Sequence, residues 1–119
     1  AAPPPPVGTR AAPALARLAG AGAFESLFER GRRIDGRYMQ LIVAATDAPQ
    51  GRVGFVISRK ALSRAVDRNR LRRQIRAMLA ARADVLAAFD IIVRAKAPLK
   101  RADLAAAATE ARALIARIG

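Results

Sequence analysis

The hydrophobic positions near the start of the chain follow a helical spacing. Phe24, Leu27 and Phe28 lie at i, i+3 and i+4, which places them on one face of a helix. Gly31 follows this run, and glycine is a favoured residue just beyond the end of a helix. The pattern predicts a short amphipathic helix that begins after Gly22 and ends near Gly31.

The next three apolar segments have the composition of β-strands. Residues 33–35 form a short segment, and residues 38–45 and 52–58 form two longer ones that are rich in strand-forming residues. The connecting residues 47–51 contain Asp, Pro and Gly, which favour turns, so we expect the two longer strands to pair as an antiparallel hairpin. Gly54, inside the last strand, indicates a bulge or a close approach to its backbone.

The second half of the chain alternates helix, strand and helix. The apolar spacing is helical over residues 63–88, fits a buried strand over 90–95, and is helical again over 103–118. One stripe of the closing helix holds Leu104, Ala108, Ala111, Ile115 and Ile118. The complete order is αβββαβα, which predicts an α+β fold with helices packed on a small sheet in two layers.

Residues 1–16 differ in composition from the rest of the chain. They contain four consecutive prolines among small residues, which is typical of a disordered or polyproline II tail, so we place one folded domain at residues 17–119. The lack of acidic residues before Glu25 also fits a transit peptide, although Ser and Thr are scarce there. No apolar run approaches the roughly 20 residues that span a bilayer. We expect a soluble, cytoplasmic protein, or an organellar one if residues 1–16 are a transit peptide.

The charge of the chain indicates a polyanionic partner. Its 119 residues suffice for one domain, and 22 Lys and Arg against 9 Asp and Glu give a net charge of +13 and a pI near 11.9. Nucleic acid and anionic membrane are the candidate partners. The sequence has no Cys and no His, which excludes thiolate nucleophiles, Cys/His zinc sites and imidazole general bases. We therefore expect no active site built from this chain alone.

The positive charge is concentrated in residues 59–76, which have a net charge of +7 because only Asp67 is acidic. The basic residues of this segment are Arg59, Lys60, Arg64, Arg68, Arg70, Arg72, Arg73 and Arg76. On a helical projection Leu71, Ile75 and Leu79 form an apolar face, and the arginines from 70 onward lie on the other side. Arg68 falls at the edge of the apolar face.

A basic helical face of this kind has three explanations. A solvated surface usually mixes charges of both signs, whereas like charges at i, i+4 cost roughly a few tenths of a kcal/mol per pair. A membrane-bound helix needs an exposed apolar face, whereas the sheet is expected to cover that face here. A phosphate array would offset the repulsion, and RNA fits better than sequence-read DNA because the sequence has no helix-turn-helix pair and no heptads. The few aromatic residues fit the core, although one beside the sheet–helix cleft could stack on an unpaired base.

Four segments of the chain, in order, also carry the pattern of a known family. They are Arg17-Leu18 with Phe24 to Arg33, the strand RVGFVISRK over 52–60, the helix DRNRLRRQIR over 67–76, and the strand DIIVRA over 90–95. The helix is similar to an Arg-Asn-Arg signature helix, and RVGFVISRK is similar to the strand that precedes it in that family. The four segments span residues 17–118, and with them the chain resembles the protein subunit of bacterial ribonuclease P.

The resemblance implies a fold, a function and a set of partners. The fold would be a two-layer αβββαβα sandwich whose four-stranded sheet contains a left-handed βαβ crossover, similar to the second domain of a small-subunit ribosomal protein. The function would be that of a protein cofactor to a catalytic RNA, which removes the 5′ leader of precursor tRNA by Mg²⁺-dependent hydrolysis. The Mg²⁺ ions would be held mainly by RNA and substrate, and the partners would be ribonuclease P RNA and precursor tRNA, without membrane or DNA.

The resemblance also assigns site residues. The signature helix and its adjoining loop would contact the catalytic RNA through Arg59, Lys60, Arg64, Arg68, Asn69, Arg70, Arg72, Arg73 and Arg76, with bracing of the helix as a second role for Asn69. Phe24, Phe28 and Ser58 would line a cleft between sheet and signature helix that holds the single-stranded leader. No catalytic residue and no metal ligand is expected in the chain.

The chain departs from the family pattern at several positions. Ile42 stands where relatives present an aromatic side chain toward the leader, and Tyr38 is displaced from that position. Ala77 replaces the usual Glu or Gln after the last signature arginine, and Arg59 replaces a Lys. A structural RNA-binding protein of the ribosomal type is the alternative function. A ribonuclease P subunit favours precursor tRNA over mature tRNA in the holoenzyme, whereas a ribosomal protein does not.

Overall fold

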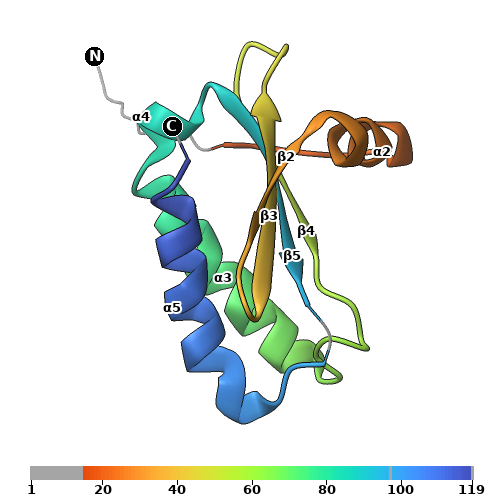
Figure 1. The fold of residues 1–119 in the computed structure, drawn as a ribbon, viewed down its shortest axis with the longest axis vertical. Coiled ribbons are helices and arrows are strands. Elements are labelled where there is room, and N and C mark those ends of the chain that lie inside the picture. The colour runs from red at the N-terminus through yellow and green to blue at the C-terminus, as the bar shows by residue number, and fades with distance from the viewer. Residues whose placement is uncertain (1–14, 97, 119) are drawn as a thin grey trace, which may run out of the picture.

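The computed structural model describes residues 15–96 and 98–118, and its helices and strands follow the predicted order with two short additions, β1 and α4. The strands are β1 (Ala16–Arg17), β2 (Arg32–Asp35), β3 (Met39–Ala45), β4 (Arg52–Val56) and β5 (Phe89–Ala95). The helices are α2 (Ala21–Arg30), α3 (Ala65–Ala80), α4 (Ala83–Leu86) and α5 (Leu104–Ile115), with the 3₁₀ turn η1 (Arg101–Asp103) before α5 (Figure 1). Most of the predicted tail, residues 1–14, lies outside the described residues, and Ala16 belongs to β1.

Strand β5 lies in the middle of a five-stranded sheet of order β1-β4-β5-β3-β2. It is antiparallel to β3 and parallel to β4. The predicted hairpin between residues 38–45 and 52–58 is therefore wrong, because β5 separates these two strands. The physical reason is that Ile91, Ile92 and Val93 form an apolar run that needs cover on all sides, and all three are fully buried. The hairpin that does form joins β2 to β3.

The predicted four-stranded sheet also needs correction. The additional strand β1 has only two residues and pairs in parallel with Arg52 and Val53 at the outer edge of β4. Its apolar neighbour Leu18 is buried, and the Leu18 N–H donates to the Val53 carbonyl at 2.9 Å. So short a segment carries no periodic pattern, which is why the sequence did not predict it.

The helices pack on both faces of the sheet, and they do so unequally (Figure 1). Helices α3 and α5 lie together on one face, over a core that includes Leu41 and Val43 of β3. Helix α2 lies on the opposite face, where Leu27 packs against Ile42 and against Ile92 of β5. This division follows from the alternation of side chains along each strand. The helices therefore form one layer on each side of the sheet, rather than the single helical layer that was predicted.

The helix predicted over residues 63–88 is divided into α3 and α4. The chain turns at Ala81 and Arg82, and the Arg82 guanidinium donates to the backbone carbonyls of Ile115 and Ile118 at the end of α5. A break made by such a distant contact leaves no Gly or Pro signal in the sequence. β4 and β5 are parallel neighbours joined through α3 and α4, which confirms the βαβ unit, and its left-handed crossover stays a prediction.

The turn between β2 and β3 is held by Glu110 of α5. One oxygen of its carboxylate accepts the backbone N–H groups of Tyr38 and Met39, and the other accepts the N–H of Arg37, each at 2.7 Å. A Cβ atom at Gly36 would lie 2.3 Å from the Glu110 Oε1 atom, so a side chain there would displace this carboxylate from the turn. The ammonium of Lys96 completes the turn by donating to the Gly36 carbonyl at 2.7 Å. The sequence did not single out Glu110, because its partners are backbone groups more than 70 positions away.

We expect Glu110→Ala to lower the free energy of unfolding by about 2–3 kcal/mol, because three N–H donors lose a charged acceptor. Chemical denaturation measures this change. Thr109→Ala, at an exposed position of the same helix, is the matched control and should change the free energy by less than about 0.5 kcal/mol. Equal effects of the two substitutions would show that the Glu110 contacts do not stabilise the fold.

Candidate nucleic-acid interface

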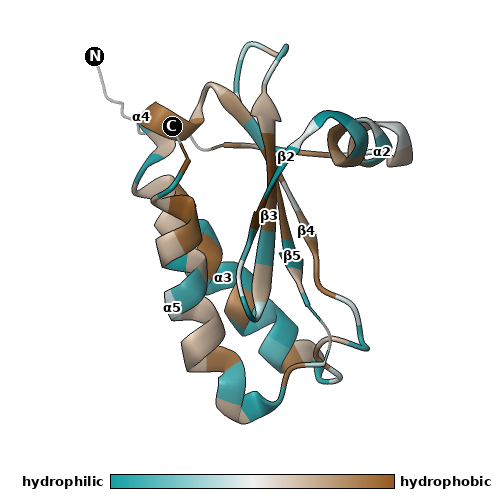
Figure 2. Cartoon of the chain, in the orientation of Figure 1, coloured by the Kyte–Doolittle hydropathy of each residue, from teal (hydrophilic) through white to brown (hydrophobic). Residues whose placement is uncertain are grey.

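The amphipathic pattern of α3 determines which of its side chains face solvent. Leu71, Ile75 and Leu79 are buried against the sheet and α5, as predicted from the helical projection. Asp67 lies in the first turn, where a carboxylate interacts favourably with the helix dipole. Figure 2 shows hydrophilic segments along α3 and hydrophobic ones in the strands that it covers. The remaining positions of α3 therefore present their arginines outward.

Five basic side chains on α3 and the loop before it form an exposed cationic surface. We call this set the α3 surface, and it consists of Arg59, Lys60, Arg64, Arg70 and Arg73. Within the described residues none of the five has a hydrogen-bond or ion-pair partner for its side chain. The nearest acid in sequence, Asp67, is buried and interacts with Arg101, whose Nε lies 3.8 Å from its Oδ1. Uncompensated positive charges on one helix and the loop before it create a local positive potential that attracts anions.

Two other arginines of the segment make contacts within the protein. Arg68 donates to the backbone carbonyls of Leu62 at 2.8 Å and Ser63 at 3.1 Å, so its side chain turns back onto the loop before α3. These two hydrogen bonds accommodate the guanidinium of Arg68 at the edge of the apolar face of α3. Arg72 donates to the Asn69 Oδ1 atom at 2.8 Å, so Asn69 braces a neighbouring side chain on the same helix.

The loop before α3 is held by hydrogen bonds on both sides of Ala61. Ser58 accepts the Ala61 N–H through its hydroxyl at 3.1 Å, and the Ala61 carbonyl accepts the Leu99 N–H at 2.7 Å. Ala61 and Leu62 are buried, while Arg59 and Lys60 between them and β4 are exposed. The loop therefore holds its basic residues outward on a fixed backbone.

A groove of about 470 Å³ lies at the outer edge of β4, between the start of α2 and α3. Its lining includes three arginines and two aromatic rings, namely Arg17, Arg72, Arg76, Phe24 and Phe55. The Arg76 guanidinium lies over the Phe55 ring, 5.3 Å from its centroid. β1 pairs only with Arg52 and Val53, so no described strand covers the edge of β4 beyond them.

Gly54 provides the space for one of these rings. A Cβ atom at Gly54 would lie 2.5 Å from the Cζ atom of Phe24, which confirms the close approach predicted at this glycine. Phe24 is partly buried, packing on the apolar cluster beneath α2 and facing the groove. The structure thus brings Phe24 together with Arg72 and Arg76.

The other residues assigned to the cleft lie outside the lining of this groove. Phe28 is one turn further along α2 and packs, partly buried, against the apolar cluster beneath that helix. Ser58 is exposed after the end of β4. Ile42 is aliphatic and fully buried in the cluster beneath α2. Tyr38 packs against the main core, so its ring does not line the groove.

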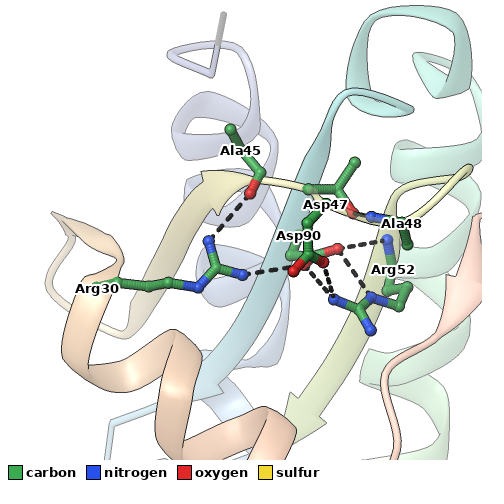
Figure 3. A network of polar contacts seen from close by, with 7 residues as sticks. Arg30, Ala45, Asp47, Ala48, Arg52 and Asp90 are labelled. Carbon is green, nitrogen blue, oxygen red and sulfur yellow. Dashed lines mark hydrogen bonds and ion pairs between the residues drawn. The ribbon is translucent and has the colours of Figure 1, made fainter.

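Helix α2, which carries Phe24, is tied to the sheet by the Asp90 carboxylate (Figure 3). Asp90 is fully buried and accepts from Arg52 Nε at 3.1 Å, from Arg52 Nη2 at 2.6 Å and from Arg30 Nη2 at 3.2 Å. Arg30 is the last residue of α2 and also donates to the Ala45 carbonyl at 3.0 Å. Asp90 therefore links α2, β4 and β5.

These contacts shift the ionisation of both partners. Burial alone would raise the pKa of Asp90, but hydrogen bonds from Arg52 and Thr46 outweigh it and hold this pKa below its ordinary value of 3.8. The hydrogen bonds with Asp90 in turn raise the pKa of Arg52 above its ordinary value. The pair therefore remains charged at neutral pH.

We expect Asp90→Asn to lower the free energy of unfolding at pH 7 by about 3 kcal/mol, because two arginines lose a buried counter-charge. The lowered pKa of Asp90 stabilises the fold fully above about pH 3.8, the ordinary pKa of this group. This stabilisation is lost as the pH falls through the pKa of Asp90 in the folded state. The wild-type chain should therefore lose stability more steeply below pH 4 than the variant, as measured by denaturation at each pH. Glu25→Gln, at an exposed site of α2, is the control and should follow the wild type. Identical pH profiles for wild type and Asp90→Asn would contradict the assignment.

The described residues lack two other kinds of site. They gather no set of three or more His, Cys, Asp or Glu side chains that would hold a metal ion. None of the helices in the described ranges combines the length and apolarity that a membrane crossing needs.

The chain is similar to known proteins in sequence and in fold. The family model for ribonuclease P matches residues 12–119. A ribonuclease P protein component from Acidothermus cellulolyticus is 38% identical over 109 residues, which cover 89% of this chain and 90% of that protein. One from Nitrosococcus oceani is 34% identical over 87 residues, which cover 73% of each. The RNase P protein of Staphylococcus aureus has the same fold, with a TM-score of 0.68 at 24% identity over 86% of this chain and 95% of that one.

A basic α+β domain that presents an arginine-rich helix beside its sheet belongs to the class of RNA-binding proteins. Together with the family match, these relatives show that the chain belongs to the ribonuclease P protein family. It is therefore the protein component of a tRNA-processing ribonucleoprotein, and the ribonuclease P RNA is its partner.

Sequence reasoning missed two residues of the groove, Arg17 and Phe55. Arg17 stands next to the predicted tail, and only its place in β1 brings it beside α3. Phe55 fits the core by its position in an apolar strand, and its ring indeed packs partly against the main core. The signal that could have indicated the groove was Gly54, whose missing side chain admits a ring from another element.

Proposed function

We propose that this protein is a cofactor of the ribonuclease P ribozyme, which binds the catalytic RNA through the α3 surface and holds the 5′ leader of precursor tRNA in the groove at β4. The observation that carries this proposal is the arrangement of five uncompensated basic side chains next to a groove that combines three arginines with two aromatic rings. The five basic side chains suit a phosphate backbone, and the groove with its arginines and aromatic rings suits an unpaired strand.

The α3 surface supports the catalytic-RNA assignment. The like charges of Arg70 and Arg73 on one helix repel each other at a cost of roughly a few tenths of a kcal/mol, which phosphates offset on binding. Arg68, Arg72 and Asn69 were assigned to the same contact. Arg68 binds the loop before α3, and Arg72 binds Asn69. In this proposal the three side chains position the α3 surface and contact RNA with their remaining N–H groups.

The groove supports the leader assignment. A single strand is bound by cations that follow its backbone and by rings on which its bases stack. Arg17, Arg72 and Arg76 supply the cations, and Phe24 with Phe55 supplies the rings. Phe28 and Ser58 remain proposed leader contacts, and they would extend the path beyond the groove.

The chemical step in this proposal belongs to the RNA. The buried acids Asp67 and Asp90 interact with arginines, and the described residues form no metal cluster. In this proposal the Mg²⁺ ions of the hydrolysis are held mainly by RNA and substrate. The protein contributes phosphate neutralisation and a grip on the leader, and we place its site of action in the cytoplasm.

Reconstitution tests the function as a whole. We expect this chain to raise accurate 5′ cleavage of precursor tRNA by a bacterial ribonuclease P RNA at low Mg²⁺ above the level of the RNA alone. A parallel reaction without protein is the control. Binding to the RNA without any gain in cleavage would favour a structural RNA-binding role instead.

We expect Arg70→Ala with Arg73→Ala to weaken binding of ribonuclease P RNA and to reduce the slope of log K against log salt by about 1.4–1.8 units, because each lost phosphate contact removes about 0.7–0.9 units. Filter binding over a salt series measures the slope. Arg112→Ala with Arg117→Ala removes the same charge from exposed positions around the end of α5 and is the control. An equal slope for the two double variants would contradict the α3 assignment.

We expect Phe24→Leu to weaken the binding of precursor tRNA to the holoenzyme roughly tenfold and to leave leaderless tRNA unchanged, because a base loses its stacking partner. Leucine keeps an apolar contact on Gly54, so the fold is retained. Phe89→Leu, at a partly buried position of the main core, is the matched control. Equal losses for both tRNAs would show that Phe24 acts only in packing.

A further inference from the structure

The edge strand β2 and the turn after it carry three arginines that the interface described above does not use. We call Arg32, Arg33 and Arg37 the β2-edge surface, and all three are exposed. In the part of the chain that the structure describes, the side chains of Arg32 and Arg33 have no hydrogen-bond or ion-pair partner. The Arg37 guanidinium lies over the Tyr38 ring, 5.3 Å from its centroid, which leaves its N–H groups available.

Two acids beside this strand and turn, Asp35 and Glu110, have other partners. Asp35 accepts from the Gln40 side chain at 2.7 Å and forms an ion pair with Lys96 at 3.3 Å. Glu110 accepts the three backbone N–H groups of the turn. Asp35 also attracts the charge of Arg33 without forming an ion pair with it, so the positive charge of the β2-edge surface is only partly offset locally.

The backbone places the three arginines on both faces of β2 and in the turn that follows it. Arg32 points to the same face as buried Ile34, and Arg33 points to the opposite face, because side chains alternate along a strand. Arg37 lies in the turn after β2, which Glu110 holds in place by accepting the Arg37 backbone N–H. Cations on both faces and at the end of an exposed edge fit an extended polyanion better than a small anion.

The β2-edge surface lies across the sheet from β4, the strand that leads into the α3 surface. β2 is the last strand on one side of the sheet, and β5 and β3 separate it from β4, a distance of about 14 Å across the strands (Figure 1). The two surfaces therefore meet different parts of a folded RNA. A membrane fits less well, because the large exposed apolar side chains of the described residues, Val66 and Val85, lie on α3 and α4.

We propose that Arg32, Arg33 and Arg37 form a second RNA-binding surface, which holds a backbone segment of the ribonuclease P RNA distinct from the segment on α3. The inference rests on the proposed RNA-cofactor function. It adds a contact on the opposite edge of the sheet, so that the RNA engages the protein from two sides.

The experiment uses the full chain and ribonuclease P RNA. We expect the triple substitution of Arg32, Arg33 and Arg37 to Gln to lower the slope of log K against log salt by about 2–3 units. Hydroxyl-radical footprinting should show that one RNA segment loses protection, and that it differs from the segment lost in the Arg70→Ala, Arg73→Ala variant. Substitution of Lys100, Arg112 and Arg117 to Gln removes the same charge from exposed positions on and beside α5 and should leave the footprint unchanged.

Protection of the sheet edge against pairing is the competing role for charged residues on β2. A Gln triple variant that self-associates in light scattering, while its salt slope and footprint match the control triple, would overturn the proposal in favour of that role. Loss of binding to phosphatidylserine vesicles with unchanged RNA binding would overturn it in favour of a membrane contact. Substitution of the three arginines to Lys keeps the charge and should retain most of the slope.

The design separates this proposal from the proposed function. If wild-type RNA binding and the slope change of the Arg70→Ala, Arg73→Ala variant are observed but the β2-edge variant behaves as its control, only the second surface is wrong. If the wild-type chain does not bind the RNA, both proposals fail.

Discussion

The buried Asp90 carboxylate is the interaction on which the arrangement of the molecule depends. It stands near the start of the central strand β5 and receives Arg52 from β4 and Arg30 from α2. Removing water from a carboxylate is costly unless charged donors replace it, and here two guanidinium groups do so. The position of α2, and with it the ring of Phe24 above Gly54, follows from this link. The groove at β4 is therefore shaped by a residue that does not line it.

The distribution of charge follows one rule across much of the fold. Asp35, Asp67, Asp90 and Glu110 are all engaged in contacts that hold loops, turns or helices in place. The arginines of the α3 surface and of the β2 edge have no such partners within the described residues. These four acids thus stabilise the structure, while the unpaired arginines remain available to a polyanion.

The sequence was sufficient to predict most elements and the identity of the cationic helix, because both follow from the periodicity of apolar residues and from local charge. Leu71, Ile75 and Leu79 are buried as expected. The pairing of strands was not accessible in this way, because periodicity does not show that β5 inserts between β3 and β4. The groove was predicted only through Phe24, since Arg17 and Phe55 reach it through long-range packing. The same limit applies to Arg68 and Asn69, whose partners depend on side-chain direction.

The crowding of like charges on α3 has a consequence for how the free protein responds to its solution. Added salt screens the repulsion between Arg70, Arg73 and their basic neighbours, and so favours the folded, unbound chain. The same ions compete with the chain for phosphates and weaken a complex with RNA. Ionic strength therefore acts on the two states in opposite directions, and bound RNA takes over the role of counterion that salt has in the free protein. The folded state is stabilised by its partner through simple mass action, in proportion to the logarithm of the RNA concentration once that exceeds Kd.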